Sequence, residues 1–252
     1  MSEASPRLRR TLEEWLVHTL VPGRLYIWRH ARRALRRGER ELSLLPVLVD
    51  PNRAALDVGA NKGDYSYFLS RLCPRVVAFE CNPKIVRFLR RTVAANVEVE
   101  EVALSDQAGQ GVMRIPRGSR GHSNQRGTLA PKKIVADVTE VPVRMRRLDD
   151  YGFDDVGFVK VDVEGFELRV LEGARETLAR CRPVLLLELE EIHLEMPLEA
   201  AFDAVRAHGY RGLALTSSGL VDLDRFDVEG YHRNPASRSD YVFNYIFLPA
   251  GA

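Results

Sequence analysis

One stretch of sequence decides the fold of this chain: Ala54-Ala55-Leu56-Asp57-Val58-Gly59-Ala60-Asn61-Lys62-Gly63-Asp64-Tyr65. Its apolar first half predicts a short buried strand, and its second half predicts a glycine turn that starts a helix. Gly59 and Gly63 permit backbone angles and a close ligand approach that a side chain would prevent. The N–H groups at the helix start are then free to face a ligand. The stretch therefore predicts an α/β protein with a nucleotide-type cofactor site.

The kind of cofactor follows from what this turn lacks. A dinucleotide fingerprint needs glycine at its first, third and sixth positions, and only the first of these, Gly59, is glycine here. No Gly-Lys-Ser/Thr phosphate loop follows either. Asp57 would repel a pyrophosphate but suits the ammonium group of S-adenosylmethionine (SAM), which also carries a sulfonium and no phosphate. The alternative is a strand–helix turn that binds nothing. We predict that SAM is held by Asp57, Gly59, Asn61, Gly63 and Tyr65.

The bulk composition is that of a soluble α/β chain. Its 252 residues are 45% hydrophobic and 29% charged, with a net charge of +2. No apolar run approaches the roughly 20 residues of a membrane span, and the first residues lack the apolar block of a secretory signal. Three cysteines are too few and too scattered for a disulfide framework or a zinc site. The expected compartment is the cytoplasm.

Residues 1–50 differ from the rest and predict a helical, arginine-rich extension before a catalytic domain at 51–252. Apolar residues at helical spacing predict one helix over 12–20 and another over about 25–45. Ten arginines and four glutamates give residues 1–40 a net charge of +6. The basic helix is a solvated face, a dock for an anionic or glycan substrate, or a peripheral contact with an anionic membrane. Nucleic acid is not expected, because aromatic residues do not interleave with one basic face.

Strands and helices alternate from residue 51 onward, which predicts a mostly parallel, doubly wound sheet. The last strand has only a loop before it and could insert antiparallel. Two further strands, at 112–115 and 141–145, flank a long polar loop at 117–133 that would fold over the cofactor or face the acceptor. The predicted strands of the sheet cover residues 53–58, 75–80, 97–104, 156–161, 184–189, 213–216 and 241–248.

In open α/β sheets, ligands lie beyond the carboxyl ends of the strands. The second predicted strand ends at Glu80, 21 residues after Gly59, where an acid can hold a ribose diol. Asn82 would add to the same contact. The third ends at Ser105 and Asp106, which we place beside the adenine, although a turn cap explains them nearly as well.

The next two strands end in acids. Asp162 and Glu164 stand two apart, so an extended chain puts them on one face, together with Lys160. A buried lysine needs a carboxylate partner, and we predict a structural pair rather than a base. Asp162 and Glu188 could hold a magnesium ion; we favour a metal-free role in orienting ammonium and substrate. His193 could accept a proton from a substrate hydroxyl, and the alternative is a surface or capping histidine.

These segments together resemble the FkbM family of SAM-dependent methyltransferases over about residues 54–249. The resemblance rests on Leu56-Asp57-Val58-Gly59-Ala60-Asn61-Lys62-Gly63, Ala103-Leu104-Ser105-Asp106, Arg147-Leu148-Asp149-Asp150-Tyr151, Val159-Lys160-Val161-Asp162-Val163-Glu164-Gly165-Phe166-Glu167 and Asn244-Tyr245-Ile246-Phe247-Leu248-Pro249. It implies a seven-stranded Rossmann-like sheet, SAM as methyl donor, and O-methylation of a hydroxyl on a sugar, glycan or natural product. Residues 1–50 and 225–238 lie outside the resemblance, and substrate choice could reside there.

Two other classes of function stay open on the sequence alone. One is a nucleotide-binding oxidoreductase on the same architecture, against which the missing glycines argue. The other is a non-enzymatic module that binds nucleic acid or anionic membrane through the basic helix. Our prediction is a methyltransferase for a small-molecule or glycan hydroxyl, with homo-oligomerisation left open.

Overall fold

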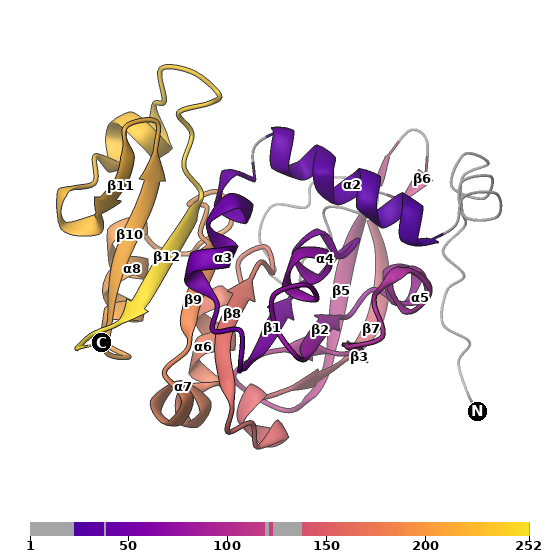
Figure 1. Ribbon diagram of the computed structural model, residues 1–252. Helices are drawn as coiled ribbons and strands as arrows, with labels where there is room; N and C mark the ends of the chain where they lie inside the picture. Colours follow the sequence, from indigo (N-terminus) through magenta and orange to yellow (C-terminus); the bar gives the residue numbers. More distant parts are fainter. Residues whose placement is uncertain (1–22, 38, 119–120, 123–137, 252) are drawn as a thin grey trace.

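An eight-stranded sheet forms the centre of the molecule (Figure 1). The computed structural model describes residues 23–37, 39–118, 121–122 and 138–251. Across the sheet the strand order is β11-β10-β12-β9-β8-β1-β2-β3. In chain order these strands are β1 (Ala54–Val58), β2 (Val76–Glu80), β3 (Val97–Glu101), β8 (Val156–Val161), β9 (Val184–Glu188), β10 (Tyr210–Thr216), β11 (Gly219–Asp222) and β12 (Asn244–Pro249).

The five strands from β3 to β9 run parallel, as the sequence predicts. The last strand, β12, lies between β9 and β10 and is antiparallel to both, so its predicted antiparallel insertion is confirmed. The resemblance implied seven strands. The eighth is β11, which pairs with β10 as a short hairpin at the sheet edge and was not predicted.

Helices cover both faces of the sheet. Pro83 starts α5, and the Asn82 side chain caps it by accepting the Lys84 N–H. Asp149 accepts the Thr177 N–H and hydroxyl at the start of α7, so this acid of the family segment orders a helix. The helices are α2 (Gly23–Arg37), η1 (Arg40–Leu44), α3 (Leu45–Leu48), α4 (Asp64–Leu69), α5 (Pro83–Thr92), η2 (Leu148–Tyr151), α6 (Glu167–Glu172), α7 (Arg175–Cys181), α8 (Leu198–Arg206), η3 (Leu223–Arg225) and η4 (Glu229–Arg233).

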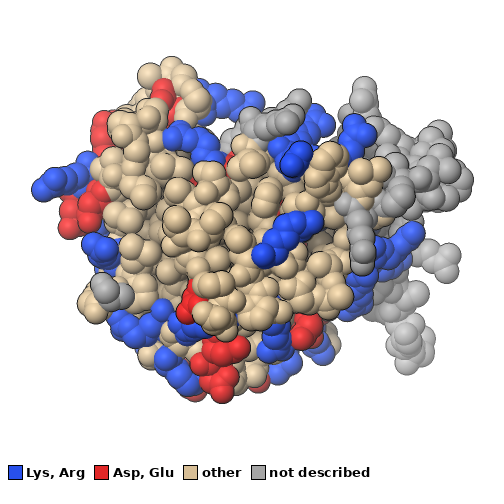
Figure 2. All heavy atoms as spheres, in the orientation of Figure 1, with Lys and Arg blue, Asp and Glu red and all other residues tan. Residues whose placement is uncertain are grey.

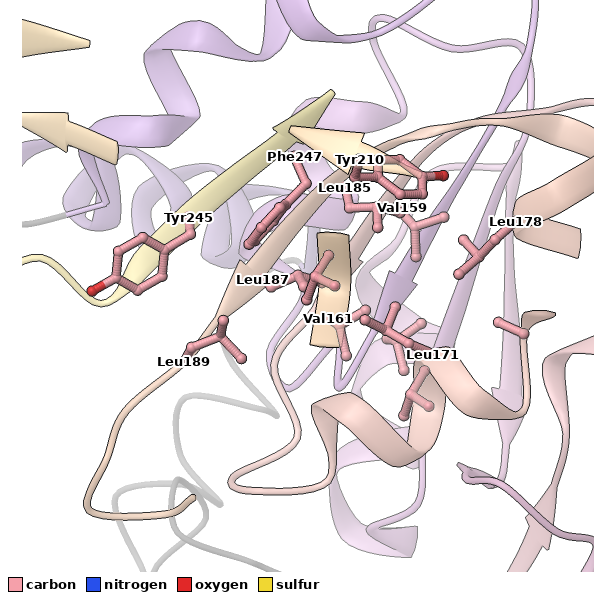
Figure 3. Close-up of a cluster of buried hydrophobic side chains, with 14 of the residues drawn as sticks. Val159, Val161, Leu171, Leu178, Leu185, Leu187, Leu189, Tyr210, Tyr245 and Phe247 are labelled. Carbon is pink, nitrogen blue, oxygen red and sulfur yellow. The ribbon is translucent and has the colours of Figure 1, made fainter. Parts of the chain in front are cut away.

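The core lies on both sides of the central strands, because successive side chains of a strand point to opposite faces. Leu185 and Leu187 of β9 pack with α6, α7 and α8 (Figure 3), whereas Leu186 packs on the other side with α3, α4 and α5. In β8, Val159 packs on the same side as Leu185 and Leu187, and Phe158 packs on the side of Leu186. Burial on both faces explains why these strands read as continuous apolar runs.

A second, four-stranded sheet has the order β4-β7-β5-β6. The predicted single strand at 97–104 is wrong at its end: it breaks at Val102 into β3 and β4, and β4 leaves to pair with β7. The predicted strands at 112–115 and 141–145 are real but longer, and they pair with each other. Most of the polar loop between them lies outside the described residues. The strands are β4 (Ala103–Leu104), β5 (Gly109–Gly118), β6 (Gly121–His122) and β7 (Val138–Arg146).

The described part of the N-terminal segment is helical and packs on helices that cover the sheet. The helix predicted over 25–45 is divided into α2, η1 and α3, and the helix predicted over 12–20 lies outside the described residues. In Figure 1, α2 crosses the top of the molecule and packs on α4 and α5. The His30 Nδ1 lies 2.7 Å from an Asp64 carboxylate oxygen and joins α2 to α4. Within the described ranges, no helix is long and apolar enough to span a bilayer.

Candidate active site

A cleft of about 1180 Å³ opens at the carboxyl ends of β1, β2, β8 and β9. Its walls come from the turn after β1, the end of β2, the β4–β5 region, the loop after β8, the end of β9, Leu215 of β10, and the segments 30–41 and 238–243. Of the predicted site residues, it is lined by Gly59, Asn61, Glu80, Asn82, Asp162, Glu164 and Glu188.

The turn after β1 holds its shape through close backbone contacts. Gly59 has φ 79°, and a Cβ there would lie 1.8 Å from the carbonyl oxygen of Asp162. No side chain fits this approach between β1 and β8. Asn61 also has a left-handed backbone, with φ 46°, which asparagine tolerates better than most residues.

The Asn61 side chain is the clearest sign of a ligand in the turn. Its Oδ1 is buried and finds no hydrogen-bond partner among the described residues. A buried acceptor without a partner costs roughly 1–3 kcal/mol. Because Asn61 lines the cleft, a bound donor such as an ammonium group could satisfy this oxygen.

Glu80 lies at the end of β2, where the sequence places it, and its carboxylate is held by the backbone. Its two oxygens accept the Asn61 N–H at 2.9 Å and the Asn82 N–H at 2.7 Å. Burial raises the Glu80 pKa to about 7, and these hydrogen bonds oppose that rise. The Cys81 N–H also bonds this carboxylate, and a carboxylate has about four lone-pair sites. The group therefore keeps a lone pair for a hydroxyl of a diol in the cleft.

Three residues predicted to hold the cofactor lie behind the cleft. Asp57 is buried and accepts the Ser66 N–H at 2.8 Å and the Ser66 hydroxyl at 2.5 Å. Tyr65 is buried and donates to Glu39 at 3.1 Å, and Gly63 faces Leu89 of α5. None of them is among the cleft's lining residues. Their positions support a role in shaping the turn instead of touching a ligand.

Ser105 and Asp106 also lie away from the cleft, and the break at Val102 is the reason. Ser105 is fully buried, its N–H binds the Arg146 carbonyl, and its hydroxyl donates to Asp106 at 2.8 Å. A Cβ on Gly173 would lie 2.0 Å from the Ser105 carbonyl oxygen, so this turn packs on the end of α6. The alternative reading as a turn cap fits this geometry better. The neighbouring cleft wall is lined instead by Phe79, Val102, Ala103, Leu104 and Met113.

The predicted lysine–carboxylate pair is present, with an added partner. Lys160 is 1% exposed, and its Nζ lies 3.9 Å from a Glu188 oxygen and 2.9 Å from Asn244 Oδ1. Burial favours the neutral amine, but Asp162 and Glu188 together raise the Lys160 pKa. Burial also raises the pKa of both acids, which share a side-chain hydrogen bond.

His193 lies beside the cleft and touches its wall. Its Nε2 is 3.0 Å from Glu164 and 3.5 Å from Glu190, and both acids line the cleft although His193 itself does not. The hydrogen bond with Glu164 raises the His193 pKa above its usual 6.5. The loop that carries Glu164 is anchored by Glu167, which accepts the N–H groups of Val163 and Gly165.

Sequence reasoning missed several residues in or behind the cleft. Asn244 lies 84 positions from Lys160 and meets it only because β12 inserts beside β9. Glu39 and Glu41 lie in or next to a segment that the sequence analysis treated as basic. Met113 lies in a strand that was predicted outside the central sheet strands. Nothing in local spacing marks any of the four. Among the described residues, no group of three or more His, Cys, Asp or Glu side chains is arranged to hold a metal ion.

Comparison with known proteins gives the class of protein. A family model described as the methyltransferase FkbM domain matches residues 57–211, which is more than half of the chain. An FkbM methyltransferase from Methylobacillus flagellatus KT shares the fold, with a TM-score of 0.51 and 18% identity over 84% of this chain and 48% of that one. The chain is a Rossmann-like α/β methyltransferase. It belongs to the FkbM methyltransferase family.

Curated relatives are consistent with this assignment. The 2-O-methyltransferase NoeI of Sinorhizobium fredii is 26% identical over 64% of this chain and 74% of its own length. The methyltransferase sdnD of Sordaria araneosa is 28% identical over 50% of this chain and 61% of its own. The AMB antimetabolite synthetase AmbE of Pseudomonas aeruginosa is 26% identical over 77% of this chain, which spans only 11% of AmbE.

Proposed function

We propose that the chain transfers a methyl group from SAM to a hydroxyl of a sugar, glycan or other small molecule. The observation that supports SAM as the cofactor is that Glu80 and Asn61 lie together in one cleft. Glu80 offers a free lone pair to a ribose diol, and the buried Asn61 oxygen awaits a donor. Both groups lie at the turn after β1, which has no phosphate-binding motif. The name of the relative NoeI supports oxygen as the methylated atom.

Asn61 and the backbone at Gly59 would hold the methionine end of the cofactor, and Glu80 would hold its ribose. The apolar wall from Val102 to Leu104, with Met113, offers a dry surface for a flat adenine ring. When bound, SAM supplies a methyl carbon made electrophilic by its sulfonium. A cationic ligand also suits the acids on the floor of the cleft, since it favours their charged forms.

Orientation of the acceptor falls to the residues at the ends of β8 and β9. Asp162, Glu164 and Glu188 face the cleft beyond the cofactor turn, and their fixed positions would align an oxygen with the reacting carbon. Positioning of this kind supplies much of the rate in transfer between bound partners. The acceptor proton would leave to His193, through Glu164 or water, because His193 contacts the lining acids and not the cleft itself.

Calorimetry tests the cofactor directly. We expect the protein to bind SAM and S-adenosylhomocysteine, and not NAD. Glu80→Ala should weaken S-adenosylhomocysteine by at least about tenfold, the loss expected for hydrogen bonds to a charged group. Arg75→Ala, at the other end of β2 and paired on the surface with Glu98, is the matched control and should bind normally. Unchanged affinity in Glu80→Ala would remove Glu80 from the site, and NAD binding without SAM binding would defeat the proposal.

A further inference from the structure

Two exposed arginines line the opening of a cleft whose other charged lining residues are mostly acids. Acids such as Glu80, Asp162 and Glu188 line the floor, whereas Arg33 and Arg238 line the same cleft as exposed side chains. Arg33 comes from α2, and Arg238 comes from the segment between η4 and β12. Basic side chains predominate along the upper part of the face shown in Figure 2, over α2. Two arginines from opposite ends of the sequence therefore share one opening.

Neither Arg33 nor Arg238 has an ion-pair partner in the part of the chain that the structure describes. His30 is held by Asp64, Arg40 donates to the Thr216 carbonyl at 2.5 Å, and Arg233 binds Glu191 and Glu199. Those three side chains are used within the protein. The charges of Arg33 and Arg238 are left for a ligand.

The positions of Arg33 and Arg238 indicate that they bind the methyl acceptor rather than the cofactor. His30 lies over the start of α4, and Arg33 follows one helical turn later, about 5 Å along the axis toward η1. The chain then reaches β10, where Arg40 meets Thr216. This part of the cleft, with Leu215 and Tyr241, lies across the sheet from Glu80. Neither arginine lies in the residues matched by the family model.

We infer that the methyl acceptor carries an anionic group, a carboxylate or a phosphate, that Arg33 and Arg238 bind at the cleft mouth. This inference rests on the proposed function and narrows its substrate class. Two guanidinium groups facing one opening suit the paired oxygens of such an anion. The acidic floor then receives the cationic cofactor and the acceptor's hydroxyl, and the two arginines receive the acceptor's anionic group.

The test uses the full chain saturated with S-adenosylhomocysteine and three sugar probes: glucose, glucuronate and glucose 6-phosphate. Titration followed by ligand-observed NMR should show that at least one anionic sugar binds tenfold or more tightly than glucose. Arg33→Gln and Arg238→Gln should each weaken that binding at least fivefold. Arg29→Gln is the matched control, because Arg29 is on the same helix but does not line the cleft. The stronger of the two anionic probes identifies carboxylate or phosphate.

The other possible results of this experiment contradict either the inference or the proposed function. Equal binding of the three sugars, binding of none, or an anionic preference that survives in the Arg33→Gln/Arg238→Gln variant would overturn the inference. A rise in the dissociation constant for S-adenosylhomocysteine in either single variant would also overturn it, because the arginines would then bind the cofactor's own carboxylate. Failure of the wild-type chain to bind S-adenosylhomocysteine would instead refute the proposed function.

Discussion

At the scale of single residues, some acids near the cleft only shape its walls, whereas others face into it. Asp57 and Glu80 are both acids at strand ends, yet Asp57 is used by Ser66 while Glu80 faces the cleft. The difference lies in direction: successive positions of a strand and its turn point to different sides. A sequence motif identifies both acids and cannot tell which side each one faces.

His193 gives a prediction at this scale. A general base must be neutral to accept a proton, so turnover should rise with pH through the His193 pKa, which Glu164 raises above 6.5. Removing the Glu164 charge in Glu164→Gln lowers that pKa and should move the acidic limb of the kcat profile to lower pH. His193→Asn should abolish the limb and lower kcat by about a hundredfold.

The measurement is a pH–rate profile with labelled SAM and an acceptor found by screening for methylated products. The dissociation constant of S-adenosylhomocysteine, unchanged in His193→Asn, serves as the control. Full turnover in His193→Asn would dismiss His193 as the base. If the acidic limb of the profile stays in place in Glu164→Gln, Glu164 does not control the pKa that this limb reports.

At the scale of elements, the contact between the β1 turn and β8 decides whether the cleft forms. Gly59→Ala places a Cβ against the Asp162 carbonyl at 1.8 Å, so backbone must move. We expect a loss of at least about 3 kcal/mol in the free energy of unfolding, measured by urea denaturation. Gly152→Ala is the control: its φ of 65° is similar, but nothing lies within 4 Å, so only backbone strain of about 1 kcal/mol is expected. Equal losses in the two variants would show that strain alone explains them.

The elements also show how far sequence reasoning reaches. The buried parallel strands were predictable because each is an apolar run followed by a helix. The end of the predicted strand at 97–104 was not, because the apolar run Val102-Ala103-Leu104 reads as more of the same strand and the break depends on β7, far along the chain. Ser105 and Asp106 were misplaced for that reason, since their position follows the strand they were thought to end. Glu80 lies where predicted because β2 is continuous.

At the scale of the whole molecule, cofactor binding should stabilise the fold. The cleft takes its walls from segments between residues 30 and 243, so a bound ligand holds distant parts of the chain together. S-adenosylhomocysteine at a hundred times its dissociation constant adds about 2.7 kcal/mol. This should raise Tm by about 5–10 °C for a domain of this size. Differential scanning fluorimetry measures the shift, NAD is the control ligand, and a Tm unmoved by S-adenosylhomocysteine would contradict the prediction.

The place of β12 sets an order of assembly for the chain. Its neighbours in the sheet, β9 and β10, do not pair with each other, so the β10–β11 hairpin cannot join the parallel strands until residues 244–249 arrive. The same strand delivers Asn244 to Lys160. A nascent or shortened chain that stops before Asn244 would therefore expose two open strand edges and leave a buried ammonium group poorly solvated. Such an intermediate invites pairing with other chains, and helper proteins that shield strand edges would act on it at this stage.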